Sequence, residues 1–257
     1  MKVLLILVDG MRPDALNDVP EAQAMIRKSA STMTAQTVWP SVTLPCHMSL
    51  FHSVDPSRHG MTNNVYRPPV RPVDGIFETV YQSGKRTAFF YGWQQLQDLC
   101  RPGNLTYGKF FSWKDNKTTS NRILCDDCIA HLTAEQPDFA FLYLAWTDEV
   151  GHEHGWMTPQ YLDCVQDSWN DIQRVRDGIP EDYVVMVIAD HGGHSRTHGY
   201  TCPEDMTIPV ILCGGPFTAG SDLGDDVNIK DIAPTILDLL GVSAPAEWEG
   251  KSLVPHE

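Results

Sequence analysis

Three histidines and an aspartate stand within nine residues, directly after an apolar stretch of the chain. The nine residues begin at Asp190, end at His198 and include His191 and His194. The preceding run, residues 183–189, is typical of a strand buried on both faces. Carboxylates and imidazoles at the end of a buried strand indicate a divalent metal site. The alternative is a polar loop with scattered histidines, and this segment alone does not separate the two.

Two other apolar runs end in the same way. Residues 3–8 lead into Asp9, and residues 139–146 lead into Asp148, which His152 follows four positions later. In an open parallel sheet, ligands bind outside the carboxyl ends of the strands. Parallel pairing would bring the three aspartates to one edge of the sheet. This convergence favours the metal site over the scattered loop.

Apolar strands alternate with helical segments along the whole chain. Helices are expected from Thr43, over residues 158–177, and over residues 231–240, where Gly241 ends the last one. This alternation predicts an α/β three-layer sandwich with a central, mostly parallel sheet covered by helices on both faces. No repeat or linker divides the sequence, so we expect one domain over residues 1–257.

Composition restricts the partners. The formal net charge is −14, from 19 Lys and Arg against 33 Asp and Glu, which argues against a nucleic-acid polymer or an anionic membrane as partner. A small anionic substrate remains compatible, because bound cations reverse the local field. Seven cysteines are too few and odd in number for a disulfide framework, and the apolar run at residues 3–8 is too short for a signal peptide. We therefore expect a soluble, cytoplasmic protein.

Short segments in a fixed order resemble the alkaline phosphatase superfamily, and most closely its nucleotide pyrophosphatase/phosphodiesterase branch. The segments are residues 8–14, 40–45, 58–64, 148–152, 189–192, 198–200 and 231–237. The resemblance implies an alkaline phosphatase-like fold and a phosphohydrolase that acts on a small phosphate ester. It also implies two divalent metal ions, usually zinc, with manganese as the alternative.

Carried over by position, the resemblance divides the ligands into two sets. The first set is Asp9, Thr43, Asp190 and His191, and the second is Asp148, His152 and His198. Thr43 would be the nucleophile and would form a phospho-threonine intermediate, because a metal-bound hydroxyl loses its proton more easily. We expect Thr43 to cap a helix, so that backbone N–H groups face the phosphoryl group.

The sequence departs from the family after the nucleophile. The family often has asparagine three residues later, where it binds phosphoryl oxygens, and this chain has Cys46, whose thiol is a weak donor. Cys46 also fits a small buried residue. The other candidate substrate contacts are His47, Asn64, Arg12 and His194, and substrate choice is expected from loops 61–74, 93–117 and 153–158.

Several activities share this pattern. A phosphodiesterase or pyrophosphatase is the leading hypothesis, and a phosphomonoesterase or phosphonate-ester hydrolase of the same superfamily is the alternative. A sulfatase would need cysteine or serine where Thr43 stands, and a phosphoglycerate-type mutase would carry a large second domain. From a different class, a non-catalytic metal- or phosphate-binding module remains open. The sequence predicts no oligomeric state.

Overall fold

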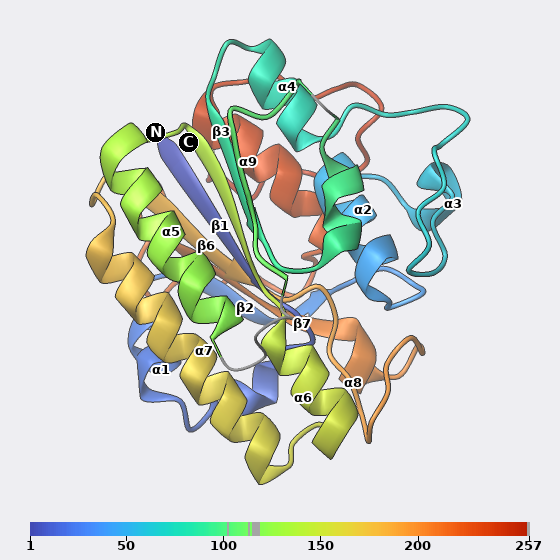
Figure 1. Cartoon of the computed structure of the whole chain (residues 1–257), viewed down its shortest axis with the longest axis vertical. Helices are drawn as coiled ribbons and strands as arrows, with labels where there is room; N and C mark the ends of the chain where they lie inside the picture. Colours follow the sequence, from blue (N-terminus) through green and yellow to red (C-terminus); the bar gives the residue numbers. More distant parts are fainter. Residues whose placement is uncertain (102, 113, 115–118, 256–257) are drawn as a thin grey trace.

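A seven-stranded sheet lies at the centre of the computed structural model, which describes residues 1–101, 103–112, 114 and 119–255. The strands stand in the order β2–β7–β6–β1–β5–β3–β4 (Figure 1). Among the strands that the structure describes, β7 alone runs opposite to the others and pairs antiparallel with both β2 and β6. Their bounds are β1 Lys2–Val8, β2 Ala30–Gln36, β3 Thr87–Tyr91, β4 Tyr107–Phe110, β5 Phe139–Leu144, β6 Tyr183–Ile188 and β7 Thr207–Cys213.

The three central strands, β6, β1 and β5, carry apolar side chains toward both faces of the sheet. Every residue of β5 and β6 is buried, and in β1 only Lys2 is not. Burial on both faces explains why these strands have continuous rather than alternating apolar sequences. Parallel pairing of β1 with both neighbours aligns their carboxyl ends. Asp9 and Asp190 therefore lie at the same edge of the sheet.

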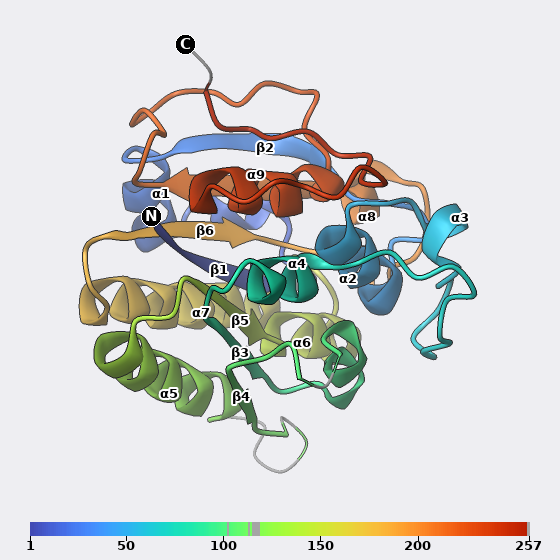
Figure 2. The ribbon, with the colours of Figure 1, turned by 90° about the horizontal axis from the view of Figure 1, so that it is seen from above.

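Helices cover both faces of the sheet, which confirms the predicted three-layer α/β fold. Helices α1, α5 and α7 lie side by side on one face, and α2, α4 and α9 pack on the other (Figures 1 and 2). No helix within the described ranges is long and apolar enough to cross a membrane. The helices are α1 Pro20–Ile26, α2 Thr43–His52, α3 Pro56–His59, α4 Ile76–Gln82, α5 Ser120–Glu135, α6 Trp146–His154, α7 Pro159–Gly178, α8 Pro203–Met206 and α9 Ile232–Leu240.

The predicted positions of two site residues are corrected. Asp148 does not end a strand: β5 stops at Leu144, and Asp148 lies in the first turn of α6. The start of α6 is buried too, so the apolar run could not separate strand from helix. Thr43 is the first helical residue of α2 and not its cap. Val42 is the extended N-cap residue, and its carbonyl accepts the N–H of Cys46.

The region expected as loop 93–117 is partly ordered into regular structure. A 3₁₀ helix spans Gln94–Leu99, and β4 forms the edge of the sheet beside β3. Residues 102, 113 and 115–117 of this loop lie outside the described residues. Alternating burial along β4 fits an edge strand with one solvated face.

Candidate metal centre

The first set of candidate ligands forms around the turn after β1. Asp9 follows the last residue of β1, and Gly10 turns the chain with a φ of 66°. The Gly10 N–H and the His191 N–H both donate to Asp190 Oδ1, at 3.1 and 3.0 Å. His191 Nε2 then lies 3.3 Å from Asp9 Oδ1 and 3.4 Å from Asp190 Oδ2. Three potential ligand atoms thus converge at a buried point.

The second set joins helix α6 to the loop after β6. Asp148 and His152 are four residues apart, which places them on one face of α6. His152 Nε2 lies 3.4 Å from Asp148 Oδ2, and His198 Nε2 lies 3.6 Å from Asp148 Oδ1. Tetrahedral zinc, with bonds of about 2.0–2.2 Å to nitrogen and oxygen, separates its ligand atoms by roughly 3.3–3.6 Å. The spacings in both sets match that geometry.

The backbone fixes the tautomer of each histidine in the two sets. Nδ1 lies 2.8 Å from the Gly192 carbonyl in His191, 2.8 Å from the Ser41 carbonyl in His198, and 3.0 Å from the Arg196 carbonyl in His152. A carbonyl only accepts, so Nδ1 carries the proton in all three rings. In its neutral form each ring then presents the Nε2 lone pair to the aspartates, as a metal-binding imidazole requires.

The surroundings of three carboxylate oxygens show whether a cation fits each ligand set. Asp9 Oδ1, Asp148 Oδ1 and Asp190 Oδ2 are buried and have no hydrogen-bond partner among the described residues. Each faces the unprotonated Nε2 of His191 or His198, so lone pairs oppose one another. Buried polar atoms are rarely left in this state unless an ion or water completes them. The residues present therefore fit a bound divalent cation in each set.

The pKa directions give the same result. Burial and the charges of the neighbouring aspartates raise the pKa of Asp9 and Asp148, and burial raises the pKa of Asp190. Burial lowers the pKa of His191 to about 4 and that of His198 to about 3. Without a cation, the fold therefore disfavours the ionised form of the three carboxyl groups. It also disfavours the protonated form of the two histidines. A cation would relieve the repulsion between carboxylates while the histidines stay neutral.

Thr43 stands beside the first set, at the start of α2. Its Oγ1 lies 3.3 Å from His191 Nε2, and the residue is 4% exposed. The exposed Asn64 accepts the Leu44 N–H through Oδ1 at 2.9 Å, which caps α2 one residue from Thr43. The first N–H groups of a helix have no partner within it. The Thr43 hydroxyl therefore stands at the N-terminus of a helix, next to the residue that Asn64 caps.

The two sets touch through their histidines. The rings of His191 and His198 are stacked, with centroids 3.8 Å apart and an interplanar angle of 14°. Behind them, Trp156 Nε1–H donates to the Gly10 carbonyl, and Tyr161 O–H donates to the same oxygen. These bonds tie the segment after α6 and helix α7 to the turn that carries Asp9.

Sequence reasoning missed two residues that hold the first set in place. The Tyr143 hydroxyl donates a short hydrogen bond to Asp9 Oδ2, and the Thr37 hydroxyl donates to the Asp190 carbonyl at 2.5 Å. Both side chains are buried. Tyr143 lies in an otherwise apolar strand, and that one hydroxyl was the only sequence signal. Nothing in the sequence marked Thr37.

Two of the predicted substrate contacts lie beneath the site. Cys46 is fully buried, and its Sγ lies 3.2 Å from the Thr37 hydroxyl oxygen. His47 is also fully buried; its Nδ1–H donates to the Thr43 carbonyl at 2.8 Å and lies 3.5 Å from Asp190 Oδ2. Both side chains pack against the ligand set from within the protein. Their positions give no support to contact with a substrate.

Arg12 is engaged with the protein itself. Its guanidinium donates to the Gly193 carbonyl at 3.1 Å and to both carboxylate oxygens of Asp14. It therefore joins the loop after Asp9 to the loop after His191. This geometry does not favour the predicted phosphate contact.

His194 belongs to a third polar group, with Cys202 and Asp205. Asp205 is buried, and both of its oxygens are satisfied, by His194 Nδ1 at 2.7 Å and by the Tyr200 N–H at 2.9 Å. The Gly192 N–H donates to the Asp205 carbonyl. Satisfied oxygens distinguish this group from the two ligand sets. It holds the loop that joins His191 to His198, and no sequence signal pointed to Asp205.

Comparison with known proteins agrees with the fold. The family model described as type I phosphodiesterase / nucleotide pyrophosphatase matches residues 3–200. The structure of murine ectonucleotide pyrophosphatase/phosphodiesterase 5 is similar with a TM-score of 0.81 at 16% identity, covering 100% of this chain and 97% of that chain. An inactive threonine-to-alanine variant of that murine protein has been solved in complex with AMP. A phosphonate monoester hydrolase from Silicibacter pomeroyi is similar with a TM-score of 0.75 at 16% identity, covering 98% of this chain and 75% of that chain.

Among curated proteins, human ectonucleotide pyrophosphatase/phosphodiesterase family member 7 is 25% identical over 219 residues, which are 74% of this chain and 47% of that protein. The 2,3-bisphosphoglycerate-independent phosphoglycerate mutase of Listeria welshimeri is 32% identical over 135 residues, 50% of this chain and 25% of the mutase. The chain spans less than half the length of these two relatives. With a family match over most of its length, the chain belongs to the type I phosphodiesterase / nucleotide pyrophosphatase family of the alkaline phosphatase superfamily.

Proposed function

We propose that the protein is a phosphoric-ester hydrolase in which Thr43 is the nucleophile and the two ligand sets each bind one divalent cation. The proposal rests on one observation: in each set, lone pairs of a carboxylate oxygen and of a histidine nitrogen face one another. Three buried carboxylate oxygens without hydrogen-bond partners among the described residues point at histidine nitrogens that carry no proton. Nitrogen and oxygen donors at these spacings suit zinc, with manganese as the alternative.

The residues around Thr43 suit in-line attack on phosphorus. Bound cations would lower the pKa of the Thr43 hydroxyl and neutralise charge on the phosphoryl oxygens. Asn64 Oδ1 accepts the Leu44 N–H, and its amide N–H₂ would then donate to a phosphoryl oxygen at Thr43. The N-terminus of α2 supplies oriented N–H groups and a partial positive charge. Attack by Thr43 Oγ1 on a diester would release one alcohol and leave the rest of the phosphate ester on Thr43, and water would then cleave the Thr43–phosphorus ester in a second step.

A phosphodiester is the substrate class that this arrangement favours. A diester carries one negative charge on its phosphoryl group, and the side-chain donor that we assign to it is the uncharged amide of Asn64. The AMP complex of the murine relative supports a nucleotide ester as a first candidate. A phosphomonoester or a phosphonate ester is the alternative within the same chemistry.

Hydrolysis of an aryl phosphodiester tests the proposal. Protein loaded with zinc or manganese should release the aryl alcohol, and Thr43→Ala should lower kcat by at least about 10³-fold, as loss of a nucleophile does. Thr79→Ala is a matched control, because the Thr79 hydroxyl only bonds the Gly75 carbonyl within α4. Full activity of Thr43→Ala would overturn the assignment. Faster hydrolysis of an aryl phosphomonoester would favour the alternative substrate.

The non-catalytic alternative is testable on the same metal-loaded protein. A non-catalytic binding module would bind metal yet hydrolyse none of these esters at any metal content.

For the compartment we propose the cytoplasm, supported by seven cysteines that are all free thiols. Fractionation of cells that express the tagged chain checks this.

A further inference from the structure

A large cavity lies between α3 and the loop that follows it. Its volume is about 720 Å³, which is within the usual range for small-molecule sites. Apolar parts of its wall come from Met61, Pro68, Pro69 and Val70. In Figure 2 this loop and α3 project from the edge of the molecule beside α2. The cavity has the size and the apolar lining of a binding site for part of a small molecule.

Three arginines give this cavity a positive charge in a protein of net charge −14. Arg58 is neutralised by Glu247 at 2.7 Å and is fixed by a 2.6 Å bond to the Arg71 carbonyl. Arg67 and Arg71 form no ion pair with any described residue. Once Arg58 is paired with Glu247, the positive charges of Arg67 and Arg71 are not neutralised by any described acidic side chain. Arginine suits phosphate and carboxylate groups because its planar fork donates two parallel hydrogen bonds.

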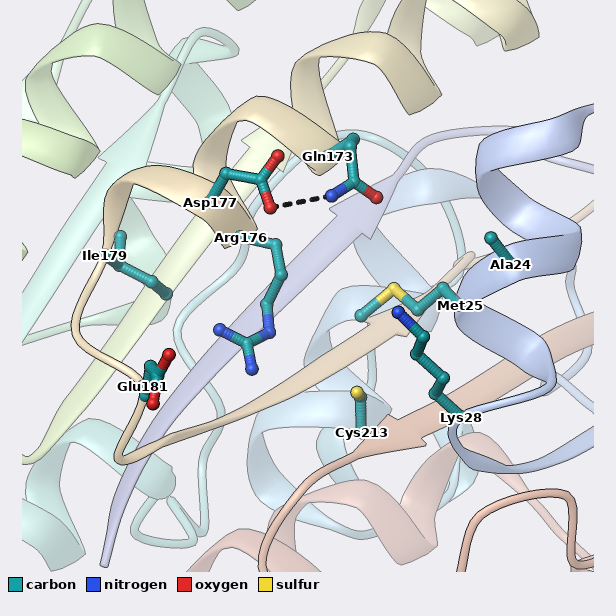
Figure 3. A pocket seen from close by; sticks show the side chains of 9 residues that line it. All are labelled: Ala24, Met25, Lys28, Gln173, Arg176, Asp177, Ile179, Glu181 and Cys213. Carbon is teal, nitrogen blue, oxygen red and sulfur yellow. Dashed lines mark hydrogen bonds between the residues drawn. The ribbon is translucent and has the colours of Figure 1, made fainter.

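A second cavity, at the other end of the sheet, shows that this excess charge is not general. That cavity of about 300 Å³ lies near the start of β6 and the end of α7. Its cations, Lys28 and Arg176, share the wall with Asp177 and Glu181 (Figure 3). Two positive and two negative groups leave it without net charge. Of these two cavities, only the one beside α3 has an excess of positive charge in its described lining.

The loop that lines the cavity beside α3 also carries Asn64 to the nucleophile. The Met61 N–H donates to His59 Nδ1 at 3.0 Å, and the Arg67 N–H donates to Met61 Sδ at 3.3 Å. These contacts close residues 61–67 into a compact turn. At the tip of the turn, Asn64 bonds the Leu44 N–H, one residue from Thr43. The cavity and the reacting centre therefore share one short segment.

We infer that the cavity beside α3 is a subsite for a second anionic group of the substrate, a phosphate or carboxylate carried beyond the scissile phosphodiester. This inference rests on the proposed function. Arg67 and Arg71 bind the anion, while Arg58 and Glu247 hold the wall in place. The natural substrate is then a diester or pyrophosphate with at least one further negative charge.

A set of matched aryl phosphodiesters tests the subsite. The esters share the leaving group and a linker of graded length, and end in a phosphate, a carboxylate or a neutral carboxamide. The wild-type protein should prefer an anionic ester over the carboxamide by about 10–100-fold in kcat/KM at low salt, the value of one or two charge-assisted hydrogen bonds. High salt should reduce the preference. Comparison of the phosphate and carboxylate series identifies which anion fits.

The variants separate the subsite from the chemistry. In Arg67→Ala/Arg71→Ala the preference ratio should fall to about one, because charge-assisted bonds at both guanidiniums are lost. Arg27→Ala, an exposed arginine at the end of α1, should keep the wild-type ratio. No preference at any linker length, or a preference that survives the double substitution, would overturn the subsite. Failure to cleave even the carboxamide ester would instead contradict the proposed function.

Discussion

The rings of His191 and His198 are stacked 3.8 Å apart, one from each ligand set. Their Nδ1–H groups donate to different backbone carbonyls, of Gly192 and Ser41, so the pair is fixed from both sides. The loop that joins them is held by the carboxylate of Asp205. The spacing between the two proposed cations is therefore set by a rigid element of the fold.

Substitution of these histidines should separate the two sets. His191→Ala removes the Nε2 that faces Asp9 and Asp190, and should lose one cation per chain together with activation of Thr43. His198→Ala should lose the other cation and weaken substrate capture. Metal analysis by mass spectrometry, with kcat and KM measured on the same samples, checks both.

The ring stack requires its own control. His152→Ala removes a ligand of the second set and keeps both stacked rings, although His152 also makes a tilted ring contact with His198 at 5.0 Å. It should behave as His198→Ala does. If His191→Ala and His152→Ala lost the same single cation, the division into two sets would be wrong.

Tyr143→Phe should weaken the first cation site while the fold survives. The Tyr143 hydroxyl bonds Asp9 Oδ2, and loss of such a supporting bond usually lowers metal affinity by about 10–100-fold. Tyr183→Phe is the matched control, because this buried tyrosine donates to the Pro137 carbonyl at the far end of the sheet. Competition with a chelator measures the affinities. Equal affinities in the two variants would show that Tyr143 does not orient Asp9.

Asp9→Asn should stabilise the metal-free protein and abolish metal binding in the first set. The pKa of Asp9 is raised by burial and by the charges of Asp190 and Asp148. A group with a raised pKa in the fold stabilises the protein below its unfolded pKa and loses that contribution as pH rises through the folded value. The metal-free wild type should therefore lose stability toward neutral pH. Asparagine carries no charge and can donate to His191 Nε2.

Thermal unfolding in excess chelator measures this effect between about pH 5 and about pH 8. At the upper end, Asp9→Asn should raise Tm by about 2–8 °C, which is about 1–2 kcal/mol for a domain of this size. Saturating zinc should reverse the order of the two proteins. Toward acid pH both proteins should lose stability. Burial lowers the pKa of His191 to about 4, so protons bind this histidine more readily in the unfolded chain than in the fold. A lower Tm for Asp9→Asn without metal would contradict this account.

Asn64 should contribute in two separable ways. Asn64→Asp keeps an oxygen that accepts the Leu44 N–H but removes the amide donor, so the helix cap survives and turnover falls by about 10²–10³-fold. Asn64→Ala loses both and should also lower the free energy of unfolding by about 1 kcal/mol. Denaturant melts and steady-state kinetics on both variants check the separation. Equal turnover in Asn64→Asp and the wild type would remove Asn64 from the site.

The sequence predicted the parts of this structure that follow from local pattern. Continuous apolar runs marked the central strands, and their carboxyl ends located Asp9 and Asp190 correctly. Asp148 reached the same edge by a different route, from the first turn of α6. The prediction survived because a short strand-to-helix connection keeps the residue at that edge.

Contacts between residues far apart in the chain could not be predicted from the sequence. Tyr143 bonds Asp9 across 134 positions of the chain, and Thr37 bonds Asp190 across 153. Such pairs depend on strand order, which hydrophobic pattern does not encode. The bond from Arg12 to the Gly193 carbonyl, across 181 positions, belongs to the same class, and the sequence did not indicate it.

The most direct measurement is a titration of the metal-free protein with zinc, with hydrolysis of an aryl phosphodiester followed at each addition. Two ligand sets joined by stacked histidines predict that the protein binds two equivalents per chain, and that activity appears only as the second site fills. Full activity at one equivalent, or binding of a single cation with no further rise in activity, would contradict the two-cation account.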